Sequence, residues 1–241
     1  MAISIKNNAH QVALSWGEIF YRNPGTVLIA YEATPILPHK DCKSCHEPAF
    51  YQPYMDQYHR IVNFPKLVLT DDTCSDRSLE SVTEITVFQV GIDGKEEKQK
   101  ELYSDAFTIV NTKNDSFVID ELKPSLYKQE DVRRHVVGEG KGYHGTRTYN
   151  GFLLTEILQR ANIRPDLNAV FLVSAPDDYR SVFSYGELFY SRTNQSLMLA
   201  IQENRKQLKA GGKYFLVVPD DLMADRWIKS VKRIETITLK K

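Results

Sequence analysis

The apolar residues of this chain fall into short runs separated by turn-forming residues. Runs of this kind are typical of buried strands. They occur at residues 67–69, 107–110, 117–119, 170–173 and 215–218. Residues 85–90 alternate between polar and apolar positions, and residues 91–94 (GIDG) have the composition of a hairpin turn. Residues 151–158 have a helical pattern that ends near Ala161. Short strands mixed with short helices predict the α+β class.

Two stretches of the sequence are nearly identical in pattern. Residues 15–21 (SWGEIFY) return as residues 184–190 (SYGELFY), and a second matched block follows each of them. The second block matches residues 67–72 with 216–221, Asp76-Arg77 with Asp225-Arg226, and Ser81-Val82 with Ser230-Val231. Two matched blocks in the same order predict that one structural module occurs twice.

Each first block begins with the pattern of a helix-capping box. A serine side chain at the cap accepts from a backbone N–H, and a glutamate three residues later reaches back to the cap. Ser15 with Glu18 and Ser184 with Glu187 fit this pattern. We therefore predict a short helix after each serine, and we interpret both glutamates as capping groups rather than catalytic ones.

The two modules differ in completeness. Residues 2–5 match the strand expected at residues 171–174, so nothing in the first module corresponds to residues 85–168. We predict a partial module over residues 1–84, with an insertion at residues 33–65, and a complete module over residues 85–241. A chain that starts inside a module suggests either that preceding residues, including a signal peptide, have been removed or that residue 1 is the mature start of a protein that has lost half a module.

The second module resembles the molybdopterin-binding domain of the sulfite oxidase family. The residues that carry this resemblance are 149–158 (YNGFLLTEIL), 178–180 (DYR), 211–219 (GGKYFLVVP) and 227–231 (WIKSV). The resemblance implies an α+β domain with a mixed, curved β-sheet. It also implies a molybdenum held by a pterin dithiolene and by one protein cysteine.

The cysteine that would hold molybdenum is absent from the expected segment, residues 132–145. Molybdenum prefers a soft thiolate, and no cysteine follows Cys74. Molybdopterin chemistry is therefore not expected in this chain. Basic residues in and near this segment could still bind an anion such as a pterin phosphate, or could form a solvated basic loop. These residues are Arg133, Arg134, His135, His144 and Arg147.

The insertion of the first module contains the sequence Cys42-Lys43-Ser44-Cys45-His46. Cys-x-x-Cys-His is the attachment motif of c-type haem, in which the thiols bind the macrocycle and the histidine binds the iron. Met55, His59 or His39 could supply the sixth iron ligand, because methionine and histidine both serve as axial ligands.

Two other interpretations of the insertion remain open. Cys42, Cys45 and His46 could bind zinc together with His39 or His59, since structural zinc sites use these ligand types. The two cysteines could instead form a disulfide or remain thiols. We interpret Cys74, in the turn at residues 71–76, as a packing thiol.

Composition narrows the function further. The formal net charge is zero, with 31 basic and 31 acidic residues, which argues against nucleic-acid binding. No apolar run approaches the length of a membrane span. We predict an exported, periplasmic or otherwise extracytoplasmic protein that transfers electrons to a redox partner protein or binds a ligand, without molybdenum turnover. The alternatives are a molybdopterin-dependent oxidoreductase and a non-catalytic interaction module.

Overall fold

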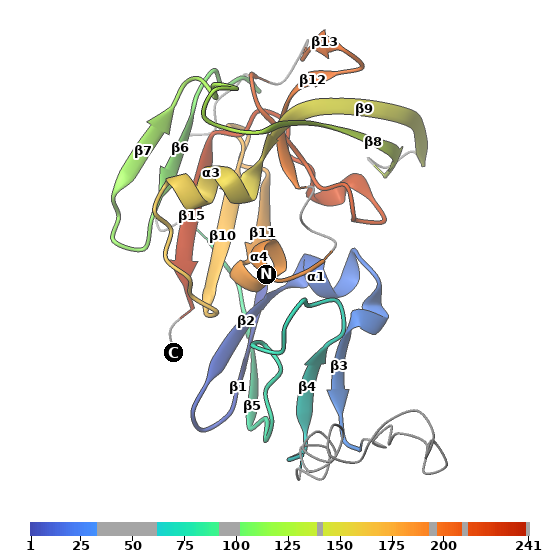
Figure 1. Cartoon of the computed structure of the whole chain (residues 1–241), viewed down its shortest axis with the longest axis vertical. Coiled ribbons are helices and arrows are strands. Elements are labelled where there is room, and N and C mark those ends of the chain that lie inside the picture. Colours follow the sequence, from blue (N-terminus) through green and yellow to red (C-terminus); the bar gives the residue numbers. More distant parts are fainter. Residues whose placement is uncertain (33–61, 92–101, 139–141, 193–196, 209–211, 240–241) are drawn as a thin grey trace, which may run out of the picture.

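The computed structural model describes residues 1–32, 62–91, 102–138, 142–192, 197–208 and 212–239 (Figure 1). The helical elements are α1 (Trp16–Phe20), α3 (Leu154–Arg160), α4 (Tyr185–Phe189) and the 3₁₀ turns η1 (Pro24–Thr26) and η3 (Ala224–Arg226). The strands of the N-terminal part are β1 (Ala2–Lys6), β2 (Gln11–Ser15), β3 (Val27–Ala30), β4 (Lys66–Leu69) and β5 (Glu84–Phe88). The remaining strands are β6 (Phe107–Val110), β7 (Ser116–Ile119), β8 (Gln129–Val137), β9 (Tyr143–Leu153), β10 (Ala169–Ser174), β11 (Arg180–Ser184), β12 (Met198–Glu203), β13 (Lys206–Gln207), β14 (Phe215–Val217) and β15 (Arg233–Thr238).

The predicted α+β class, and with it the sulfite oxidase type of fold, is wrong. The described residues are mostly β-sheet, and their three α-helices have only five, seven and five residues. The segment expected to be helical from residue 151 shows the reason. Gly151, Phe152 and Leu153 complete the long strand β9 by pairing with Ala200, Leu199 and Met198 of β12. Sheet pairing thus overrides the local helical pattern until Leu154.

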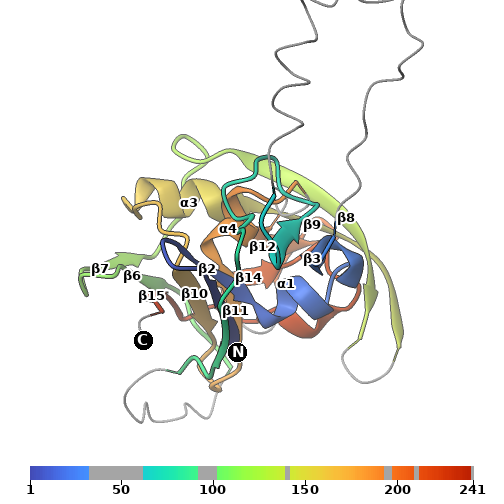
Figure 2. The same cartoon turned by 90° about the horizontal axis from the view of Figure 1, so that it is seen from below.

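The strands form four sheets among the described residues. Their orders are β2-β1-β5, β11-β10-β15-β6-β7, β13-β12-β9-β8 with β14 also paired to β12, and the two-stranded β3-β4. Strands β15 and β6 pair in parallel, and the other pairings of named strands are antiparallel. Figure 2 shows β8 and β9 as a long curved ribbon along one side of the molecule.

The same strand arrangement appears in both halves of the chain. Strand β1 lies between β2 and β5, and β10 lies between β11 and β15. Ile85 pairs with Ile5 on the first sheet, and Ile234 pairs with Val173 on the second. Both strand pairs β1–β2 and β10–β11 lead directly into a capped helix, α1 or α4.

Each capped helix packs on the sheet of the other half. Helix α1 contacts β11, and α4 contacts β2. A small apolar cluster joins the two sheets, with Ala2 and Ala13 from the first and Val170, Leu172 and Val182 from the second. The two halves are therefore interlocked through their matching elements.

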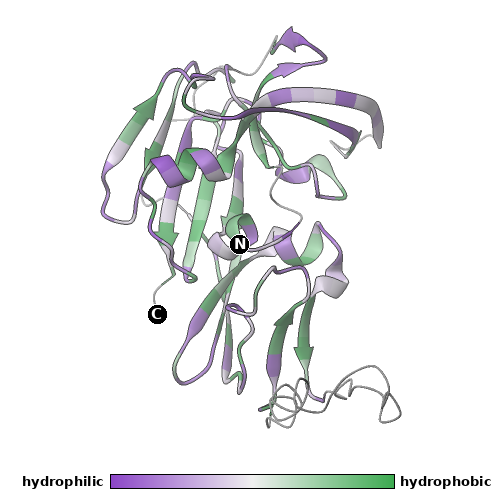
Figure 3. Cartoon of the chain, in the orientation of Figure 1, coloured by the Kyte–Doolittle hydropathy of each residue, from purple (hydrophilic) through white to green (hydrophobic). Residues whose placement is uncertain are grey.

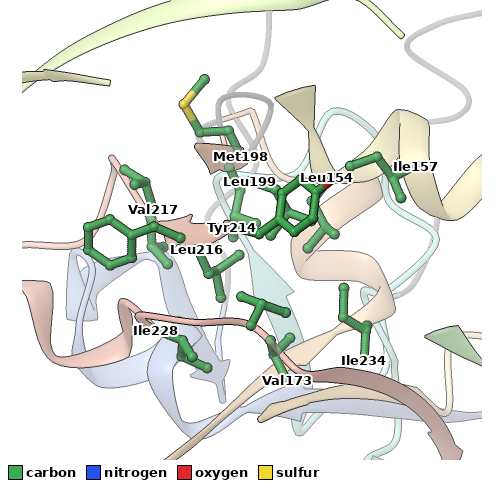
Figure 4. Packing of buried hydrophobic residues seen from close by; sticks show 14 of the residues in the cluster. Leu154, Ile157, Val173, Met198, Leu199, Tyr214, Leu216, Val217, Ile228 and Ile234 are labelled. Carbon is green, nitrogen blue, oxygen red and sulfur yellow. The ribbon is translucent and has the colours of Figure 1, made fainter. Parts of the chain in front are cut away.

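The larger core lies between the sheets of the second half. Strand β10 is buried along its whole length and is apolar throughout except at its last residue, as Figure 3 shows. Figure 4 shows Val173 of β10 and Ile234 of β15 packed beneath Leu154, Ile157 and the β12–β14 pair. Burial on both faces explains why the sequence of β10 does not alternate.

Candidate functional site

The predicted haem or zinc residues lie outside the described part of the chain. These residues are His39, Cys42, Cys45, His46, Met55 and His59. The structure does describe both strands that flank this insertion. Ala30, at the end of β3, pairs with Lys66, at the start of β4, so the chain leaves and re-enters the fold at neighbouring positions.

Polar contacts hold the re-entry point of this insertion. Glu80 accepts a hydrogen bond from the backbone N–H of Asn63 at 3.3 Å and forms an ion pair with Lys66 at 3.3 Å. The backbone N–H of Val82 donates to the Pro65 carbonyl at 2.9 Å. A segment that carries Cys42–His46 is therefore attached to the sheet by a closed two-stranded base.

The basic residues predicted for anion binding lie on the β8–β9 ribbon, and the structure brings only some of them together. Arg134 and Arg147 are cross-strand partners. Each forms an ion pair with a carboxylate: Arg134 lies 3.5 Å from Asp220, and Arg147 lies 2.6 Å from Glu203. The positive charge of each of these two arginines is therefore already paired with a negative charge of the protein.

The other members of this predicted set point elsewhere. Arg133 and His135 alternate with Arg134 along β8 and so lie on the opposite face of the ribbon. His135 is within hydrogen-bond distance of the hydroxyls of Tyr143 and Thr146. His144 contacts the Gly138 carbonyl at 2.8 Å. The five residues do not converge on one point.

A hollow of about 250 Å³ lies close to the β8–β9 tip, where Gly138 approaches the backbone N–H of Ala224. Its lining combines Tyr179 and Trp227 with the charged residues Asp225 and Lys229. Asp225 of η3 is one of the positions matched by the sequence repeat. No local signal in the sequence indicated that it would border a hollow with Asp177 and Tyr179, in the turn after β10.

A buried set of charged and hydroxyl side chains lies where α1 and α4 meet, and we call this set the junction network. It comprises Ser15, Glu18, Arg22, Asp72, Arg77, Ser184, Glu187, Asp221 and Arg226. Both capping boxes form as predicted, because each serine accepts from the glutamate backbone and each glutamate accepts from the serine backbone. The glutamates also have a second role that the capping pattern did not indicate.

Each capping glutamate accepts a hydrogen bond from the serine of the opposite half of the chain and pairs with an arginine of its own half. The Ser15 hydroxyl donates to Glu187 at 2.5 Å, and the Ser184 hydroxyl donates to Glu18 at 2.8 Å. Arg77 lies 2.5 Å from Glu18, and Arg226 lies 2.7 Å from Glu187. The signal for these contacts was present in the sequence, since the two arginines occupy matching positions of the repeat.

The arginines are held by a second set of matching acids. Arg77 donates from Nε and Nη2 to the two carboxylate oxygens of Asp72, at 2.8 and 2.5 Å. Arg226 makes the same fork with Asp221, at 2.7 and 2.6 Å. Two parallel bonds of this kind fix the guanidinium plane.

The network is not electrically symmetric. Glu187 is bound by two arginines, because Arg22 also lies 2.7 Å from it, whereas the described ion pair of Glu18 is with Arg77. Burial raises the pKa of Glu18, and the charge of Arg77 offsets this only in part. Burial also acts on Glu187, but Arg226 and Arg22 together lower its pKa. The polar atoms of both carboxylates are occupied by protein groups, which indicates a structural role.

Cys74 is exposed, so its interpretation as a packing thiol is wrong. It lies in the turn after β4, and its hydrogen bond with Asp76 raises the pKa of the thiol. No group of three or more metal-ligating side chains occurs among the residues that the structure describes. Within the same residues, no helix is both long enough and apolar enough to cross a bilayer.

No protein-family model and no curated protein matches this sequence.

Proposed function

We propose that this chain is an exported redox protein that transfers electrons through a c-type haem held by Cys42, Cys45 and His46. The observation that carries the proposal is the Cys-x-x-Cys-His motif itself. The closed β3–β4 base supports it, because both ends of the insertion join the fold through the paired residues Ala30 and Lys66.

The donor set fits this group. Two thiols and an adjacent imidazole are the side chains that covalent haem attachment and proximal iron ligation require. Met55 and His59 are candidates for the opposite axial position, with His39 as a further one. When bound, the haem would supply one-electron transfer; the protein would supply its attachment and its axial ligands.

The proposal also assigns a location and a partner. Covalent haem attachment follows export, so we propose an extracytoplasmic location and a redox partner protein. The rest of the chain then acts as a scaffold whose junction network and core hold the β3–β4 base in place. A zinc site formed by the same cysteines, His46 and His39 or His59 is the competing assignment of this donor set.

The test is to produce the full chain with an export signal in a host that attaches c-type haem. We expect a coloured protein with the absorption bands of a c-type haem and a mass increased by one haem. The double variant Cys42→Ala/Cys45→Ala should be colourless, and Cys74→Ala should retain the haem. A colourless wild-type protein from a host that matures a reference cytochrome would contradict the proposal.

Elemental analysis of the same protein separates the alternatives. Stoichiometric zinc in the wild type, lost in Cys42→Ala/Cys45→Ala, would replace the haem assignment with a zinc site. Stoichiometric molybdenum would show that the chain binds a molybdopterin without the expected cysteine.

A further inference from the structure

A second cavity lies between the β6–β7 turn and the loop that follows α3. Its volume is about 470 Å³, within the range of about 300–1,000 Å³ that is typical of small-molecule sites. Figure 1 shows the β6–β7 hairpin at the edge of the sheet that also contains β15 and β10, near α3. The cavity is lined by residues 111–113, 115, 117 and 162–166, and by Thr236 of β15.

The hydroxyl of Thr236 is the first observation that indicates a ligand. Thr236 is only 5% exposed, and its Oγ1 has no hydrogen-bond partner among the described residues. Buried hydroxyls in folded proteins are almost always bonded, so an unpaired one that borders a cavity calls for a partner from outside the chain. A hydroxyl can donate to an anionic oxygen.

The two carboxylates that line this cavity accept hydrogen bonds within the protein, whereas the two lining cations are left to meet an anion. Asp166 already accepts from the backbone of Asn168 and from Thr238, both at 2.9 Å. Asp115 already accepts from Asn111 at 3.0 Å. The side chains of the two lining cations, Lys113 and Arg164, have no hydrogen bond or ion pair within the described part of the chain.

The apolar lining favours a ligand that also has a nonpolar part. Phe117 is 40% exposed, and Ile163 and Pro165 line the cavity with it. Apolar and aromatic walls with a few polar groups are the usual composition of an organic-ligand site.

We propose that this cavity binds a small organic carboxylate. Arg164 and Lys113 pair with the carboxylate, Thr236 Oγ1 donates a hydrogen bond to it, and Phe117 and Ile163 cover the nonpolar part of the ligand. This site is independent of the proposed haem, because it uses no residue of the insertion.

The test uses benzoate as the probe and benzamide as its neutral counterpart, titrated into the full chain and followed by amide NMR shifts. We expect benzoate to shift residues 111–117, 162–166 and 236, and benzamide to bind about tenfold more weakly or not at all, since a charge-assisted bond is lost. Equal binding of the two probes, or benzoate shifts confined to other residues, would overturn the proposal.

Variants separate the binding contacts from effects on folding. Arg164→Gln, at an exposed position, should weaken benzoate binding about tenfold, whereas Arg205→Gln, exposed at the β12–β13 turn, should leave it unchanged. Thr236→Val removes the unpaired hydroxyl, so it should weaken benzoate binding without lowering thermal stability. Wild-type affinity in both Arg164→Gln and Thr236→Val would refute the assigned contacts.

Discussion

Ser184 donates a hydrogen bond from its side chain to Glu18 at 2.8 Å, across 166 positions of the sequence. The reciprocal bond, from Ser15 to Glu187, spans 172 positions. Each serine thus caps its own helix and also binds the capping glutamate of the other one. This exchange makes the junction network a feature of both halves, and it determines how they respond to mutation and to pH.

The two glutamates should differ in their contribution to stability. Glu187→Gln removes the charge that two buried arginines share, so we expect a loss of about 3–5 kcal/mol in the free energy of unfolding at neutral pH. Glu18→Gln should cost clearly less, because Glu18 contacts one arginine and burial already disfavours its charge. Urea denaturation measures both.

A matched surface variant provides the control for this comparison. Glu203→Gln removes the partly exposed ion pair with Arg147 and should cost less than about 1 kcal/mol. Equal losses for Glu18→Gln and Glu187→Gln would contradict the asymmetry of the network.

The same asymmetry predicts two separate effects of pH. The folded-state pKa of Glu18 is raised, so its stabilising contribution is present below its ordinary value of 4.5 and is lost as pH rises through the folded pKa. Wild type should therefore lose stability relative to Glu18→Gln as pH rises above 4.5. The folded-state pKa of Glu187 is lowered, so its contribution is present above 4.5 and is lost as pH falls through the folded pKa.

Denaturation across a pH series of wild type and both variants checks these signs. The difference between wild type and Glu187→Gln should shrink only on the acid side of 4.5. A difference between wild type and Glu18→Gln that is constant from acid to neutral pH would show that Glu18 titrates normally.

Two glycines are required by the crossed packing of α1 and α4. A Cβ on Gly17 would overlap the side chain of Arg226, and one on Gly186 would overlap Arg77. These arginines cannot move aside freely, because their carboxylate forks hold them. We expect Gly17→Ala and Gly186→Ala each to cost about 1–3 kcal/mol, the usual penalty of overpacking.

Gly91→Ala is the control for this steric effect, since a Cβ there would meet no atom of the described residues within 4 Å. Thermal denaturation of the three variants gives the comparison. Stability unchanged in Gly17→Ala and Gly186→Ala would mean that the arginines do not lie against the helices.

The thiol of Cys74 should react more slowly than its exposure alone suggests. Only the thiolate is nucleophilic, and the hydrogen bond with Asp76 raises the pKa of the thiol. In the Cys42→Ala/Cys45→Ala background, alkylation by iodoacetamide at neutral pH should become faster when Asp76→Asn is added. An unchanged rate, followed by mass spectrometry, would remove Asp76 as the cause.

Several local features were predictable from the sequence. The boxes at Ser15 and Ser184 each depend on residues three positions apart, so the sequence was sufficient to place both short helices. The strand cores at residues 107–110 and 170–173 were also predicted, because their apolar runs and flanking turns are local signals. The fold class was not, since Gly151–Leu153 have a helical pattern but pair with β12.

The arrangement of charges around Glu18 and Glu187 depended on the tertiary structure. The repeat in the sequence identified Arg77 and Arg226 as equivalent, but only the crossing of α1 and α4 decided which glutamate each one meets. The cavity that Thr236 borders is likewise lined by residues from three separate segments. No spacing along the chain indicates that these segments meet. Local hydrogen bonding and alternation follow from neighbouring residues, whereas burial, charge pairing and cavities depend on which distant segments come together.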